Sequence, residues 1–332
     1  MNNIINLNAS IISAASAVGK KESEGPLGEF FDIKDDTDKY GMDNFERAEA
    51  TMQRAAMNVA LAKAHIRDAD LDAIFAGDLM NQCTSSAYGL LPYNVPYFGL
   101  YGACSTAAES IMLAAIMTST GIFERVAAVT SSHYCTAERQ YRTPLEYGAQ
   151  RTPTAQWTVT GAGAFVVGNS GGNVSITGTL PGIVREMGIK DANNMGAAMA
   201  PAAADTIGRY CSCCGNSLDE IDMIVTGDLG KEGLSILKNI VGKTNPQIVE
   251  KMHDCGVMIY DIEKQDVHCG GSGCGCSAVV LASYLLPKLE RGELKNILFI
   301  GTGAMMSPMS IQQGEAIPAV AHLVRFSSGE RG

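Results

Sequence analysis

The chain has 332 residues, which is enough to bury a large core in one domain or in two packed halves. Apolar residues make up 46% of the sequence and charged residues 18%, so the composition excludes a disordered chain. The formal net charge is −10 and there is no basic run, which argues against binding nucleic acid or adsorbing directly to anionic lipid.

The sequence shows no targeting or membrane segment. No apolar stretch reaches the roughly 20 residues of a membrane-spanning helix. Residues 1–18 have no Lys or Arg before their apolar part, unlike a signal peptide. We therefore expect the ten cysteines to be thiols in a reducing compartment.

Helices and strands are predicted to alternate through the first half. Apolar residues recur every three or four positions from Phe45 to Ile66, and this period predicts a helix. A buried strand is predicted at 72–76, a second helix from about Ser105 to Thr118, and another buried strand at 126–129. This order predicts a layered α/β fold.

One segment of the chain is repeated. Asp72–Leu79 matches Asp222–Leu229 at an offset of 150 with five of eight residues identical, and each copy is followed by a Cys-Ser turn, a helix and a strand. This pattern indicates an internal duplication, although any two α/β units share some resemblance. We place the halves at 1–170 and 171–332. They are expected to pack as one unit, because a strand at 160–167 and a turn, rather than a low-complexity linker, join them.

Cys104 is the strongest candidate for a reactive residue. It follows Gly102 and Ala103 and precedes a predicted helix, whose dipole would favour the thiolate. A small buried residue at a tight turn is the alternative interpretation. Acyl transfer would also need a base and oxyanion donors, yet neither His133 nor His268 has a sequence signature for this role.

Two other clusters are weaker candidates for binding sites. The cysteines at 211–214 and around the glycine-rich run 270–275 lack the paired spacing of zinc sites, and that run lacks the Lys-Ser/Thr ending of a phosphate loop. Arg139 and Arg142 lie in a polar segment and are suited to bidentate carboxylate binding. The alternative is that both pair with Glu138 and Glu146 on a solvated loop.

Several long sequence segments resemble those of the stage V sporulation protein AD family, within the thiolase-like superfamily. The resemblance runs along nearly the whole chain and is carried by the segments at 24–28, 76–79, 101–106, 130–133, 136–140, 160–164, 199–206, 254–256, 270–278 and 304–308. The stretch Gly-Gly-Ser-Gly-Cys-Gly-Cys-Ser-Ala at 270–278 is the most specific of these.

The resemblance implies a thiolase-like five-layer αβαβα fold built from two pseudo-symmetric βαβαβ halves, and a homodimer. It implies a bacterial spore protein, peripheral on the inner spore membrane. Such a protein would bind dipicolinic acid, free or as its calcium chelate, and would act with other proteins of the stage V sporulation A operon in uptake and release during sporulation and germination. No cofactor, metal or nucleic acid is expected.

The sequence departs from the enzymes of this superfamily in its second half. The resemblance places the nucleophile of thiolases and ketoacyl synthases at Cys104, and the repeat places their catalytic His within 226–228, where this chain has none. The asparagine of the synthases falls near Gly275 and the second histidine of thiolases near Ser272 or Gly273, and His268 comes too early for that second histidine. We therefore expect a binding protein with a vestigial nucleophile. The alternatives are an active acyltransferase that uses Cys104 with His268 or His133, and an assembly subunit whose pocket is vestigial.

Dipicolinate is a planar ring with two carboxylates, so its site would need backbone N–H donors and cationic or hydroxyl groups. The helix start and the glycine-rich turn would supply the N–H groups, and an arginine the positive charge. The predicted ligand-binding residues are Cys104, Ser105, His133, Arg139, Arg142, Gly271, Ser272 and Gly273.

Overall fold

A computed structural model describes residues 4–141, 150–214 and 218–329. Its strands are β1 (Ile5–Val18), β2 (Ile33–Lys34), β3 (Ala73–Gly77), β4 (Tyr97–Gly99), β5 (Arg125–Ser132), β6 (Trp157–Thr158), β7 (Gly161–Gly168), β8 (Val174–Leu180), β9 (Met223–Thr226), β10 (Met252–Asp254), β11 (Gly271–Ser272), β12 (Asn296–Ala304) and β13 (Ala319–Ser328). The α-helices are α1 (Lys20–Ser23), α2 (Phe45–Ala64), α3 (Thr84–Leu90), α4 (Thr106–Ser119), α5 (Tyr134–Tyr141), α6 (Met195–Cys214), α7 (Gly230–Gly242), α8 (Cys255–Ile259), α9 (Cys274–Val280), α10 (Leu286–Glu290) and α11 (Pro308–Gln312).

The strands of the two halves follow the same pattern of parallel and antiparallel pairing from each edge of the sheet. From one edge the order is β4, β3, β5, β7 and β1, and from the other it is β10, β9, β12, β13 and β8. In each series the first two pairings are parallel and the next two antiparallel, and β1 meets β8 in the middle. The division proposed at residue 170 falls in the turn between β7 and β8.

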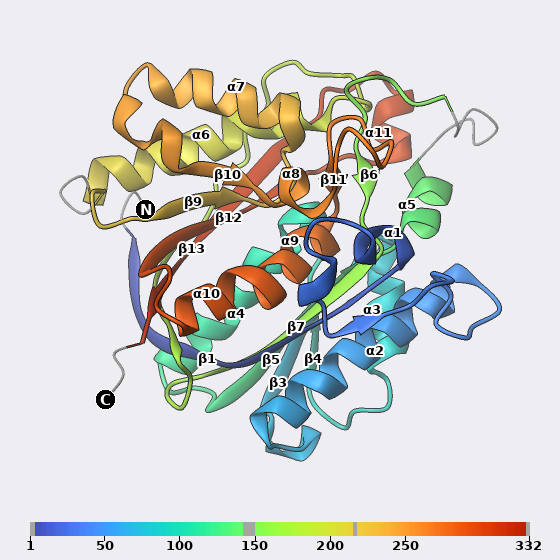
Figure 1. Cartoon of the computed structure of the whole chain (residues 1–332), viewed down its shortest axis with the longest axis vertical. Coiled ribbons are helices and arrows are strands. Elements are labelled where there is room, and N and C mark those ends of the chain that lie inside the picture. The colour runs from blue at the N-terminus through green and yellow to red at the C-terminus, as the bar shows by residue number, and fades with distance from the viewer. Residues whose placement is uncertain (1–3, 142–149, 215–217, 330–332) are drawn as a thin grey trace.

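The elements form five layers (Figure 1). Helix α4 packs against strands of both halves, and α9 packs beside it, so these two helices make the central layer. Helices α2 and α3 cover the outer face of the first half of the sheet, whereas α6 and α7 cover that of the second half. The alternating α/β prediction is confirmed as this mixed α/β fold.

The repeated segments carry matching hydrogen bonds. The Asp72 carboxylate accepts hydrogen bonds from the N–H groups of Glu124 and Arg125, at 2.6 and 3.0 Å, where β5 begins. The Asp222 carboxylate accepts the same pair from Lys295 and Asn296, at 2.6 and 2.9 Å, where β12 begins. In both halves an aspartate before one strand therefore fixes the start of its parallel neighbour.

The predicted helix at 45–66 is α2, but its buried face is displaced from the expected one. The Asn44 side chain caps its first turn by accepting a hydrogen bond from Arg47 N–H. The core-facing residues include Ala48, Met52, Ala56 and Ala60, together with the polar pair Glu49 and Gln53. Ala62, one of the recurring apolar residues that predicted this helix, is exposed. Because Glu49 and Gln53 are polar but buried, the apolar pattern alone did not identify the buried face of the helix.

Candidate functional site

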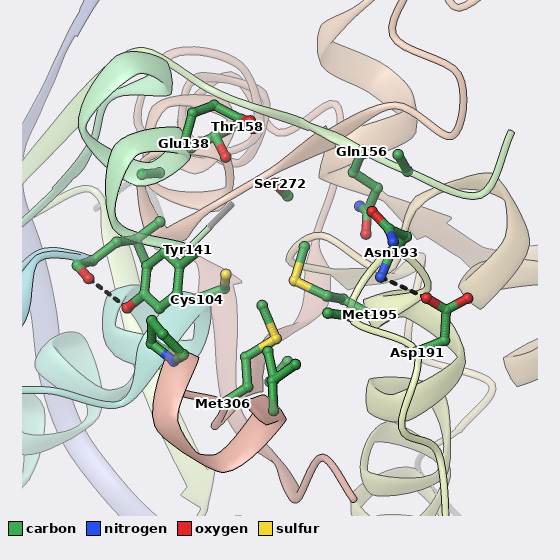
Figure 2. A pocket seen from close by; sticks show the side chains of 18 of the residues that line it. Cys104, Glu138, Tyr141, Gln156, Thr158, Asp191, Asn193, Met195, Ser272 and Met306 are labelled. Carbon is green, nitrogen blue, oxygen red and sulfur yellow. Dashed lines mark hydrogen bonds between the residues drawn. The ribbon is translucent and has the colours of Figure 1, made fainter. Parts of the chain in front are cut away.

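A cavity of about 480 Å³ lies between the halves, beyond the carboxyl ends of β3 and β12 (Figure 2). Parallel strands place binding sites at this edge of a sheet. The walls come from segments far apart in the sequence: the turn before α4, helix α5, residues 150–158, residues 190–195, Ser272 and residues 304–312. Of the eight predicted ligand-binding residues, Cys104 and Ser272 line this cavity.

Cys104 is presented by a tight turn. Ala103 has a φ of +52°, in the left-handed region, and this turns the chain before α4 begins. Ser105 donates both its hydroxyl and its N–H to the Gly102 carbonyl, at 2.6 and 3.1 Å, and Thr106 donates its hydroxyl to the Ala103 carbonyl at 2.7 Å. These bonds occupy Ser105, which is fully buried and, contrary to expectation, does not line the cavity.

A carboxyl group, rather than an imidazole, lies against the Cys104 thiol. Asp228 falls in the segment where the repeat places the catalytic histidine of the related enzymes, and its side chain contacts the thiol. The Asp228 carboxyl also accepts hydrogen bonds from Gly273 N–H and Thr302 Oγ1, both at 2.8 Å. Burial raises the pKa of Asp228 to about 7, although the Cys104 thiol and the two hydrogen bonds from Gly273 and Thr302 act to lower it.

The expectation of a thiolate at Cys104 is wrong. Burial raises the pKa of the Cys104 thiol well above its ordinary value, and the neighbouring Asp228 carboxylate and Cys274 thiol raise it further. The preceding turn leaves Cys104 two residues before the first residue of α4. Desolvation and a neighbouring negative charge therefore outweigh any favourable field from the helix, and the sulfur stays protonated at neutral pH.

Neither candidate histidine lies at the cavity. His133 is buried, accepts a hydrogen bond from Cys135 N–H at 3.1 Å, and has its Nε2 2.8 Å from the Asp38 carbonyl. His268 has its Nδ1 2.6 Å from the Thr152 carbonyl. Both rings are thus held by other segments, and His133, expected at the site, does not line the cavity.

The remaining predicted residues are divided between other structural roles. Arg139 pairs with Glu46 at 2.6 Å on an exposed surface, so it does not supply the positive charge of the cavity. Gly271 and Gly273 do not line the cavity: Gly271 accepts a hydrogen bond from Gln156, and Gly273 donates to Asp228. Arg142 lies outside the described residues.

Several lining residues gave no signal in the sequence. Among the described residues around the cavity, Lys190 brings a positive charge, and Glu138 and Asp191 bring two carboxyl groups. Gln156 is buried, and its amide nitrogen donates to the main-chain carbonyls of Asp228 and Gly271, at 2.8 and 2.7 Å. These two acceptors fix the orientation of the amide and leave its oxygen without a hydrogen-bond partner.

Comparison with known proteins shows the family to which the chain belongs. Residues 2–327 match the family model of Stage V sporulation protein AD (SpoVAD). Over 314 residues the chain is 43% identical to Stage V sporulation protein AD of Bacillus subtilis (strain 168), covering 95% of this chain and 93% of that protein. The chain belongs to the stage V sporulation protein AD family. Its role is therefore in sporulation, as the resemblance implied.

Solved structures confirm the thiolase-like fold. A variant of OleA from Xanthomonas campestris has a TM-score of 0.60 at 16% identity, covering 98% of this chain and 99% of that one. The 3-oxoacyl-[acyl-carrier-protein] synthase III of Aquifex aeolicus VF5 has a TM-score of 0.57 at 14% identity, covering 96% and 99%. In the described ranges 4–141, 150–214 and 218–329, no helix is long and apolar enough to cross a membrane.

Proposed function

We propose that this protein binds dipicolinic acid in the cavity above Cys104 without transforming it chemically, and so serves dipicolinate uptake during sporulation and its release during germination. The observation that carries the proposal is the pairing of Cys104 with Asp228. A retained cavity whose thiol stays protonated, with both candidate histidines held by other segments, has the shape of a substrate site but lacks the imidazole that would activate a cysteine nucleophile.

The residues that line the cavity suit a small aromatic anion that forms a calcium chelate. The volume falls in the range of small-molecule sites, and Leu79, Tyr141 and Met306 offer apolar surface to a ring. Lys190 can meet a ligand carboxylate, whereas Glu138 and Asp191 favour a ligand whose own charge is neutralised. We therefore propose that the calcium chelate binds more tightly than free dipicolinate.

Isothermal titration of the purified protein with dipicolinate tests this function. We expect saturable binding at millimolar ligand or below, and stronger binding when calcium is present. Cys104→Ala should change the affinity because Cys104 lines the cavity, whereas Cys213→Ala, at an exposed position on α6, should not. A flat titration with and without calcium would contradict the proposal.

The alternative function is an acyltransferase or condensing enzyme with Cys104 as nucleophile. The fold and the position of the cysteine favour it, because the solved relatives include synthases. The protonated thiol and the placement of His133 and His268 count against it. A third alternative, an assembly subunit with a vestigial pocket, predicts that cavity variants keep their biological function while surface variants lose it.

We propose that the protein is peripheral on the inner spore membrane and is held there by other proteins of the stage V sporulation A operon. The net charge of −10 disfavours direct attachment to anionic lipid. Extraction with salt or alkali, without detergent, should release the protein from spore membranes. Release only by detergent would contradict attachment through protein partners.

We further propose a homodimer formed through strand β4. This strand ends the sheet, and all three of its residues, Tyr97, Phe98 and Gly99, are exposed and uncharged. Tyr88, Leu91 and Tyr101 add exposed apolar surface nearby in the sequence. An uncharged edge strand can pair with its own copy across a two-fold axis. Sedimentation velocity should show a dimer that Phe98→Lys dissociates; a wild-type monomer would contradict the proposal.

A further inference from the structure

Asp228 lies directly beneath the floor of the cavity. Two residues of the cavity wall reach Asp228, Cys104 through its thiol and Gln156 through its amide. Gly273, which follows the wall residue Ser272, donates its N–H to the Asp228 carboxyl group. The Asp228 side chain itself is fully buried. A ligand in the cavity would therefore lie close to the carboxyl group, with Cys104 and Gln156 between the two.

Five titratable groups that face Asp228 are all acids. Cys104 lies on the turn before α4, Asp254 ends β10 and Cys255 begins α8, while Cys274 and Cys276 lie in α9. Asp254 is fully satisfied by four donors, from Thr226, Leu229, Gly230 and Val257, and contributes only repulsion. An ionised Asp228 has no buried cation in this set to balance it.

We infer that binding an anionic ligand in this cavity is coupled to the uptake of one proton by Asp228, and this rests on the proposed function. A dicarboxylate on the floor would add negative charge next to a buried carboxylate in a medium of low dielectric. Taking a proton from solvent onto one carboxylate oxygen of Asp228 removes that repulsion. The resulting O–H has the Cys104 sulfur as a neighbouring acceptor.

Proton uptake makes ligand affinity depend on pH. In the free protein the pKa of Asp228 is about 7, raised by burial, and a bound anion would raise it further. Below pH 7 the group is already protonated and the affinity should be flat. Above pH 7 the dissociation constant should rise about tenfold per pH unit until the pKa of the complex is reached. The ligand carboxyls stay ionised throughout, since carboxylic acids titrate well below this range.

Calorimetry in buffers of different ionisation enthalpy measures the coupling directly. Sodium dipicolinate without calcium would be titrated into the full chain at pH 7.5 in phosphate, HEPES and Tris. The dependence of the observed heat on buffer enthalpy should give an uptake that approaches one proton. Asp228→Asn should bind with little uptake and with an affinity independent of pH from 6.5 to 8.5. Asp219→Asn, at an exposed position, should behave like the wild type.

The outcomes separate this inference from the function on which it rests. Wild-type binding with no proton uptake at pH 7.5 would overturn the inference and leave the function standing. Uptake that persists in Asp228→Asn would assign the proton to another group and also overturn it. If Asp228→Asn does not fold, the wild-type uptake and the tenfold slope decide the question. Absence of binding at every pH would overturn the proposed function itself.

Discussion

Replacing Asp228 with asparagine should make the stability of the protein less dependent on pH. The pKa of Asp228 is raised from 3.8 to about 7 in the folded state, so folding favours the protonated form. Its contribution to stability is fully present below pH 3.8 and is lost as the pH rises to 7. The whole shift corresponds to about 4 kcal/mol at 1.36 kcal/mol per pKa unit. An asparagine keeps the shape and never ionises.

Urea denaturation across a pH series provides the assay. The accessible range begins near pH 5.5, because the sequence has a pI of about 5.0 and proteins precipitate easily near that point. Between pH 5.5 and 7 the wild type should lose about 2 kcal/mol of unfolding free energy through Asp228, and Asp228→Asn should be spared this loss. Asp219→Asn controls for the change in net charge. Parallel curves for wild type and Asp228→Asn would refute the reasoning.

Three other features of the structure give testable outcomes. Glu22 is buried with its pKa raised to about 7, so Glu22→Gln should flatten the loss of stability between pH 5.5 and 7 by about 2 kcal/mol in the same assay; an unchanged slope would contradict this. A Cβ on Gly303 would lie 2.6 Å from the carbonyl of the turn that carries Cys104, so Gly303→Ala should cost about 1–3 kcal/mol. Gly208→Ala, in an open helical position, should instead stabilise by about 0.5–1 kcal/mol. Iodoacetamide should label exposed Cys213 well before buried Cys104, as peptide mass spectrometry can follow; the reverse order would contradict a protonated Cys104.

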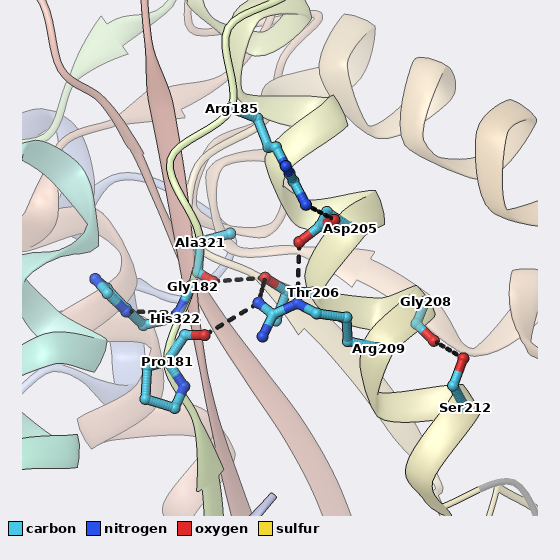
Figure 3. Close-up of polar contacts among 10 residues, drawn as sticks. All are labelled: Pro181, Gly182, Arg185, Asp205, Thr206, Gly208, Arg209, Ser212, Ala321 and His322. Atoms are coloured by element: carbon cyan, nitrogen blue, oxygen red, sulfur yellow. Dashed lines mark hydrogen bonds and ion pairs between the residues drawn. The ribbon is translucent and has the colours of Figure 1, made fainter. Parts of the chain in front are cut away.

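Polar contacts around Asp205 support the segment that precedes residues 190–195 of the cavity wall (Figure 3). Asp205 on α6 pairs with Arg185 at 2.6 Å and with Arg209 at 3.0 Å. Arg209 also donates to the Pro181 carbonyl at 3.0 Å, and Arg185 N–H donates to the Ala319 carbonyl at 2.8 Å. These contacts anchor the segment that continues to residues 190–195 at the cavity.

The elements with a local sequence signal could be predicted. The helix at 45–66, the strands around 74, 127, 164 and 298, and the repeat of Asp72–Leu79 all depend on periodicity or identity within short segments. The central strand β1 was missed, because Ile5–Val18 is rich in Ser and Ala and its alternation of apolar and polar residues stops after Ile11, although β7 and β8 flank it on both sides. A strand buried in the middle of a sheet needs no polar face.

The site was predicted less well than the fold, for a physical reason. Cys104 and Ser272 were found because a cysteine before a helix and a glycine-rich turn are local patterns. Asp228 was quoted within the repeat, but nothing local shows that its side chain meets Cys104. Likewise Arg139 pairs with Glu46, which lies 93 residues away in the sequence. Only the packing of α5 near α2 reveals this partner.

Intact-protein mass spectrometry after incubation with acyl-CoA thioesters tests most directly whether the Cys104 sulfur acts as a nucleophile. If a carboxyl group has taken the place of the activating imidazole, the mass should stay unchanged while dipicolinate still binds. A mass increase of one acyl group, mapped to Cys104 and absent in Cys104→Ala, would contradict a binding role and show a working acyltransferase.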